Sequence, residues 1–172
     1  LRLWRKLYSV TQNYFELFNL PERFQIDLEM LQENYRAIQK EIHPDRFTTS
    51  SENEKVQSMI KSTQANDGYQ TLKSPIKRAK YILSLHEPAE KITLPPDFLM
   101  QQMEWEEHFE AIEKNNSELA RFKSTINKKY GEYFSLISTQ IDDDQNWSDA
   151  AISIDKLYFI ENLLHKINSA LN

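Results

Sequence analysis

The most constraining feature of this sequence is an apolar periodicity of about 3.6 residues that recurs along almost the whole chain. Apolar side chains at this spacing line one face of an α-helix, and no stretch of strand length alternates apolar with polar residues. Only 2 of the 172 residues are glycine, whereas a β-sandwich needs more turn glycines. We therefore predict an all-α protein.

The first half of the sequence predicts an antiparallel helical hairpin flanked by two shorter helices. Prolines at positions 21, 44 and 75 mark helix ends and starts, because proline lacks a backbone donor and disfavours helical angles in the residue before it. Asp27 is the expected N-cap of the second helix. The predicted helices cover 14–19, 28–42, 52–72 and 75–83, with an exposed loop over 44–51.

The apolar pattern also predicts which faces of the hairpin helices point inward. A helix in a small domain buries its apolar stripe against its neighbours. The expected inward positions are Leu28, Leu31, Tyr35, Ile38 and Ile42 on the second helix, and Val56, Ile60, Thr63 and Tyr69 on the third.

The second half of the sequence predicts three amphipathic helices joined by short polar turns, over 97–114, 117–141 and 148–171. Three such helices with short connections form a three-helix bundle. The segment 87–96 ends in two consecutive prolines and is expected to be a linker between this bundle, residues 97–172, and an N-terminal domain over 13–86. Residues 1–12 are an N-terminal extension to which we assign no role.

Charge and composition exclude several classes of function. A net charge of -5 gives no overall positive field for a phosphate backbone, so we expect no nucleic-acid partner. No apolar run approaches the roughly 20 residues of a membrane span. Cysteine is absent, the 4 histidines are scattered, and the acids fall on solvated helical faces. We therefore expect no enzyme activity, no cofactor and no metal site.

The tripeptide His43-Pro44-Asp45 is the most distinctive motif of the chain. Taken alone it could simply end a helix, since histidine favours the helix C-terminus, proline stops the helix and aspartate caps a turn. Its context favours a functional motif over a simple helix stop, because it lies between two predicted antiparallel helices and follows Tyr35-Arg36. Together with Tyr69-Gln70-Thr71-Leu72 and Arg78-Ala79, it resembles a J-domain.

The J-domain resemblance implies that the loop docks on a DnaK-class chaperone and triggers its ATP hydrolysis. Basic residues would steer the approach. The residues that the resemblance assigns to chaperone binding are His43, Pro44, Asp45, Arg46, Arg36 and Lys40. One departure is Gly68, where J-domains usually have alanine; a mid-helix glycine costs roughly 1 kcal/mol, so a softer third helix is expected.

Two further segments, 81–86 and 98–104, are similar to the HscB family of J-domain co-chaperones. The chain has neither the glycine-phenylalanine-rich stretch nor the cysteine zinc module of ordinary DnaJ proteins. The resemblance implies a co-chaperone of iron–sulfur cluster assembly, which binds an IscU-type scaffold protein and an HscA-type chaperone. The absence of N-terminal metal-binding cysteines favours a bacterial cytoplasmic protein over a mitochondrial one.

The bundle can also be interpreted from its periodicity. The predicted helix over 97–114 has apolar residues on two sides. One side carries Phe98, Trp105, Phe109 and Ile112. The opposite side carries Leu99, Met100 and Met103. Phe159 projects away from the apolar stripe of the last helix and is expected at the surface. A clustered exposed patch of this kind is typical of a binding site. The HscB resemblance assigns scaffold binding to Leu99, Met100, Met103, Glu104, Glu107 and Phe159.

Two alternatives remain open from the sequence. A general J-protein would bind unfolded clients rather than a folded scaffold. A structural helical adaptor would use the tripeptide only as a helix stop, and Asp45 would then have no effect on a chaperone.

Overall fold

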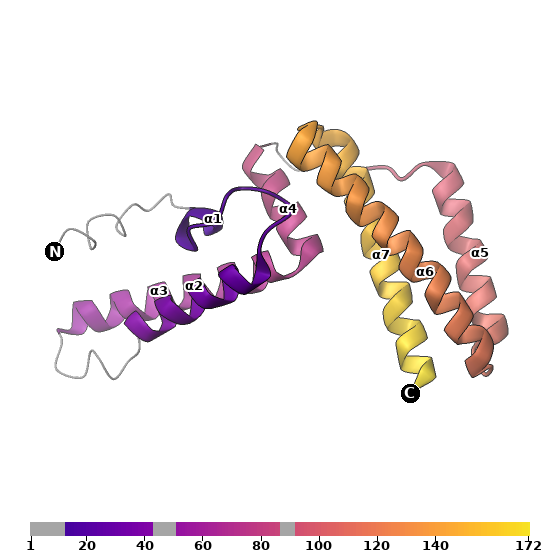
Figure 1. Ribbon diagram of the computed structural model, residues 1–172, viewed down its shortest axis with the longest axis horizontal. Helices are drawn as coiled ribbons and strands as arrows, with labels where there is room; N and C mark the ends of the chain where they lie inside the picture. The colour runs from indigo at the N-terminus through magenta and orange to yellow at the C-terminus, as the bar shows by residue number, and fades with distance from the viewer. Residues whose placement is uncertain (1–12, 43–50, 87–91) are drawn as a thin grey trace. The chain divides into compact units, whose positions relative to one another are not determined.

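The computed structural model describes residues 13–42, 51–86 and 92–172, and every regular element within these ranges is helical (Figure 1). The all-α prediction is therefore confirmed. The chain divides into two compact units. The division falls between Arg78 and Ala79, within the helix Pro75–His86.

The described part of the first unit contains a short helix, α1 (Tyr14–Leu17), followed by α2 (Leu28–Glu41). The side chain of Asn13 caps α1 by accepting a hydrogen bond from the backbone N–H of Glu16 at 2.9 Å. Asp27 caps α2, since its carboxylate accepts from Glu29 N and Met30 N at 2.9 and 3.0 Å. The predicted N-cap of the second helix is confirmed.

Two further helices follow, α3 (Glu52–Lys73) and α4 (Pro75–His86). A capping box starts α3: the Ser51 hydroxyl accepts from Glu54 N, and the Glu54 carboxylate accepts from Ser51 N at 2.9 Å. Proline is the first residue of α4, where its missing N–H costs no helical hydrogen bond.

The inward face of α3 differs from the predicted one. Val56 and Ile60 are half exposed and Thr63 is exposed, so the prediction for these three residues was wrong. The buried residues of α3 are instead Ser58, Ala65, Gly68 and Leu72. Small side chains let neighbouring backbones approach closely, and the Ser58 hydroxyl accordingly donates to the Ile42 carbonyl at 2.8 Å. Tyr69 does face inward: its ring stacks on Tyr35 with centroids 4.2 Å apart.

Large side chains from four segments form the core of the first unit, where Phe15, Phe18, Phe24, Leu31 and Leu72 are all at most 1% exposed. On α2, Leu28 lies outside this core and is 50% exposed, so its predicted inward position was wrong. Leu28 is the first residue of α2, and Leu31, about one turn later, is the residue that is buried.

In the second unit, α5 (Pro96–Ile112), α6 (Asn116–Ser138) and α7 (Trp147–Leu171) pack against one another (Figure 1). Among the described helices, α6 and α7 share the most extensive contact. One cluster of buried residues in this bundle consists of Phe109, Ile112, Leu119, Phe122, Ile126, Ile160, Leu163 and Ile167.

The connection between α6 and α7 is shorter than predicted. A π-helical turn, η3 (Thr139–Asp143), continues α6, so the irregular turn covers only 144–146. The turn is closed by hydrogen bonds from Asp144 N to Thr139 O and from Asn146 N to Gln140 O, at 2.9 and 2.8 Å. Gln145 takes a positive φ of 52° to complete the reversal.

Candidate functional site

The helix α5 has two apolar faces. Phe98, Phe109 and Ile112 point into the bundle and are buried, as the periodicity predicts. On the opposite side, Leu99 is 44% exposed, Met100 65% and Met103 64% (see α5 in Figure 1 for the helix). The prediction that these three side chains lie outside the core is confirmed. An amphipathic helix buried on one side has no structural need for large apolar residues on the other.

Acidic residues border this outer face of α5. Glu104 and Glu107 are both exposed. The Glu104 carboxylate accepts a hydrogen bond from Gln101 Nε2 at 2.8 Å, one turn earlier on the helix. Leu99, Met100, Met103, Glu104 and Glu107 are called the α5 outer face below.

Phe159 on α7 lies at a different place from the one predicted. It is half-buried, not at the surface: its ring stacks on Trp105 of α5, with centroids 6.2 Å apart and an interplanar angle of 13°. It also meets Phe98 edge to face at 6.1 Å. The prediction considered only the stripe of α7 that faces α6, whereas α7 also packs against α5, and Phe159 faces that second neighbour.

The sequence did not indicate two further residues that contact this group, one ring and one ammonium. Tyr133 of α6 meets Phe98 edge to face at 6.1 Å. The ammonium of Lys156 lies over the Phe98 ring at 5.2 Å and over the Tyr133 ring at 5.7 Å, in cation–π geometry. Burial raises the pKa of the Tyr133 hydroxyl, with a smaller raising effect from Asp97. We call Phe98, Trp105, Tyr133 and Phe159 the α5 aromatic cluster.

An ion pair adds a second link between α5 and α7. Lys166 Nζ lies 2.7 Å from Glu106 Oε1 and 2.8 Å from Glu106 Oε2. Both side chains are partly exposed, so the pair stabilises the contact by no more than about 1 kcal/mol.

The predicted chaperone-binding residues fall into two groups. His43, Pro44, Asp45 and Arg46 lie outside the described residues. Arg36 and Lys40 are described: both are exposed, and their spacing of four residues puts them on one side of α2.

Contacts with α3 hold α2 in the orientation that exposes these two bases. The Tyr35 hydroxyl donates to Asn66 Oδ1 at 2.6 Å, and Gln39 Nε2 donates to the same oxygen at 2.9 Å. The stacking of Tyr35 on Tyr69 lies alongside. Tyr35 and Gln39 thus attach α2 to α3. They lie on the side of α2 that is next to the side with Arg36 and Lys40.

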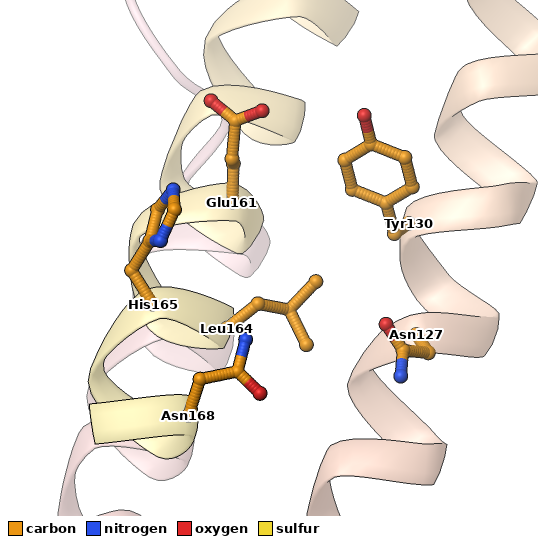
Figure 2. Close-up of a pocket in the computed structure, with 6 residues that line it drawn as sticks. All are labelled: Asn127, Tyr130, Glu161, Leu164, His165 and Asn168. Atoms are coloured by element: carbon orange, nitrogen blue, oxygen red, sulfur yellow. The ribbon is translucent and has the colours of Figure 1, made fainter. Parts of the chain in front are cut away.

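Two open grooves run along the second unit. Figure 2 shows the one between α6 and α7, where Tyr130 and Asn127 face Glu161, Leu164, His165 and Asn168. The other lies between α5 and α6 and is lined by Trp105, His108, Glu118, Arg121, Phe122 and Thr125. Within the described ranges, histidine and acidic side chains nowhere gather in threes as a metal site requires. No described helix combines the length and apolar character of a membrane crossing.

Comparison with known proteins shows similarity over both units. A family model described as the HSCB C-terminal oligomerisation domain matches residues 94–168. The co-chaperone protein HscB homolog of Vibrio vulnificus (strain CMCP6) is 41% identical over 162 residues, which cover 90% of this chain and 94% of the relative.

Solved structures give the same result for the fold. The chaperone HscB from Vibrio cholerae superposes with a TM-score of 0.85 at 37% identity, covering 92% of this chain and 96% of the other. The human co-chaperone protein HscB superposes with a TM-score of 0.87 at 28% identity, covering 94% and 83%.

Proposed function

Because the chain belongs to the HscB family of co-chaperones, we propose that it carries an iron–sulfur cluster scaffold protein of IscU type to a DnaK-class chaperone of HscA type. The bundle binds the scaffold, and the segment with His43, Pro44 and Asp45 stimulates the ATPase of the chaperone. The Vibrio relatives support a bacterial cytoplasmic setting.

The observation that carries this proposal is the α5 outer face. Leu99, Met100 and Met103 together expose large apolar side chains on one side of one helix, next to two acids. Buried apolar anchors within a polar rim are the usual composition of a protein–protein interface. Methionine adapts its shape to a partner surface. The acids at the rim favour a scaffold surface with complementary basic residues.

The first unit supplies the contact with the chaperone. Arg36 and Lys40 are exposed on α2 and can steer the approach of an acidic surface, but Glu33 and Glu41 offset their charge, so this electrostatic contribution is modest. The segment that carries Asp45 shifts the conformational equilibrium of the chaperone towards its hydrolytic state. The chemistry of ATP hydrolysis stays in the chaperone, and this chain contributes binding energy only.

The two units act together by raising effective concentration. A scaffold bound to the bundle is held near a chaperone that is bound to the first unit, so their encounter becomes intramolecular. ATP hydrolysis then traps the scaffold on the chaperone. The proposal therefore predicts synergy: chaperone stimulation by this chain grows when scaffold is present.

The deciding experiment measures the steady-state ATPase rate of the HscA-type chaperone with this chain, with and without scaffold. Asp45→Ala should abolish stimulation while scaffold affinity is unchanged, whereas Asp67→Ala, which removes an exposed acid on α3, should leave both unchanged. Stimulation that depends on Asp45 but ignores the scaffold would indicate a general J-protein. If Asp45→Ala stimulated as well as the parent chain, the tripeptide would be a helix stop.

A further inference from the structure

Trp105 lies at the centre of the contacts that join α5 to α7. Its ring is half-buried on the inner side of α5, stacked on Phe159 at 6.2 Å and edge to face with Phe98 at 6.2 Å. Phe98 in turn meets Phe159 at 6.1 Å, so the three rings contact one another in pairs. Offset and edge-to-face geometries of this kind are the favourable ones for aromatic pairs.

The same turns of α5 carry the α5 outer face. Phe98 and Trp105 are separated by seven residues, two helical turns, and Leu99, Met100 and Met103 lie between them on the opposite side. The contacts of Phe98 and Trp105 with Phe159 are thus part of what attaches these turns of α5 to the bundle.

Phe159 needs Trp105 for its own orientation. The ring of Phe159 is half-buried, so part of its surface remains open to solvent. Without the Trp105 ring beside it, the Phe159 side chain could occupy other rotamers, and a partner would have to order it on binding. Trp105 removes that ordering cost before the partner arrives.

We propose that Trp105 is a positioning residue for scaffold binding: it fixes the Phe159 ring in the arrangement that the scaffold recognises. This inference rests on the proposed function, because it assigns a role within the same binding site. Trp105 acts through Phe159 rather than as a principal contact, since its ring packs on the inner side of α5.

The test measures the affinity of the full chain for the apo form of its IscU-type scaffold by isothermal titration calorimetry. Trp105→Ala should weaken binding by about tenfold, the upper range of an aromatic pair, and Trp105→Phe should recover most of that loss. The matched control is Tyr130→Ala, which removes another half-buried ring packed on the same bundle core, stacked on Phe134 and lining the groove in Figure 2. Tyr130→Ala should change the affinity by less than about twofold, within the scatter of independent sites.

A double-mutant cycle with Phe159→Ala separates positioning from general destabilisation. If Trp105 acts through Phe159, the double variant should bind no more than about twofold more weakly than Phe159→Ala alone. Fully additive losses would overturn the inference, as would an equal loss from Tyr130→Ala.

Leu99→Ala distinguishes failure of this inference from failure of the proposed function. A scaffold affinity that falls with Leu99→Ala but not with Trp105→Ala refutes the positioning role alone. An affinity that falls with neither variant refutes both.

Discussion

Gly68 of α3 packs directly against Tyr14 of α1: a Cβ at position 68 would lie 2.9 Å from Tyr14 Cδ1 and 3.0 Å from Phe18 Cε2. The glycine that the sequence indicated as a weak point of the third helix thus lies where the Tyr14 and Phe18 rings leave no room for a larger side chain. Alanine would gain roughly 1 kcal/mol of helix propensity, but it would displace the rings at a cost of about 1–3 kcal/mol. We expect Gly68→Ala to lower the free energy of unfolding of the first unit by about 1 kcal/mol, measured by urea denaturation.

The matched control for that substitution is the other glycine of the chain. Gly131 is exposed in the interior of α6, and a Cβ there would meet nothing within 4 Å. Gly131→Ala should therefore raise the free energy of unfolding of the second unit by about 0.5–1 kcal/mol. Because the two units can unfold separately, each needs a probe of its own. An increase for both variants would show that the Tyr14 ring moves aside without cost.

Arg78 stabilises the first unit from a buried position. Its side chain is 3% exposed, donates to the Phe24 carbonyl at 2.7 Å and to the Leu72 carbonyl, and lies over the Phe24 ring at 5.2 Å. Arg78→Met would leave buried carbonyl groups without these donors, which costs about 2–3 kcal/mol in the free energy of unfolding. Lys77 is the exposed neighbour of Arg78, and Lys77→Met should change the free energy of unfolding by less than about 0.5 kcal/mol. Thermal denaturation followed by circular dichroism measures both, and equal shifts would contradict the role of Arg78.

Leu99 on the α5 outer face should contribute to scaffold binding. Leu99→Ala is expected to weaken scaffold affinity by about 1–2 kcal/mol, since it removes an apolar anchor at the centre of the proposed interface. Leu136→Ala is the matched control, because Leu136 on α6 is also 44% exposed and loses the same atoms. Fluorescence anisotropy of a labelled scaffold compares the two variants. Equal losses of affinity would place the scaffold elsewhere on the bundle.

The capping box of α3 predicts a pH dependence. Hydrogen bonds from the Ser51 backbone N–H and hydroxyl, at 2.9 and 3.0 Å, hold the pKa of the Glu54 carboxyl below its ordinary value of 4.5. The unfolded chain therefore binds a proton at a higher pH than the folded chain, so the stabilisation is present above that ordinary value and is lost as the pH falls through the folded pKa. A carbon-detected NMR titration of the Glu54 carboxyl should show the lowered pKa. Ser51→Ala keeps the backbone N–H and removes only the hydroxyl, so it should raise that pKa part of the way towards its ordinary value. An unchanged pKa in Ser51→Ala would contradict the contribution of the hydroxyl.

The sequence by itself determined the helices of this protein and much of the α5 surface. Asp27 caps a helix and Pro75 begins one through interactions with residues no more than a turn away, so their roles can be deduced from neighbours in the chain. The exposure of Leu99, Met100 and Met103 could be predicted because α5 buries one side and these residues lie on the other. The HscB resemblance, carried by local motifs, was likewise readable before the fold.

Only the tertiary structure decided which faces of α3 and α7 are buried and against what. Apolarity suggested Val56 and Ile60 as inward residues, but the close approach of α1 and α2 selects the smaller Ser58 and Gly68. Periodicity suggested a surface position for Phe159, but a second neighbouring helix places Trp105 against it. Both outcomes depend on the shape of a partner helix distant in sequence, and side chains of one helix carry no information about that shape until the helices pack.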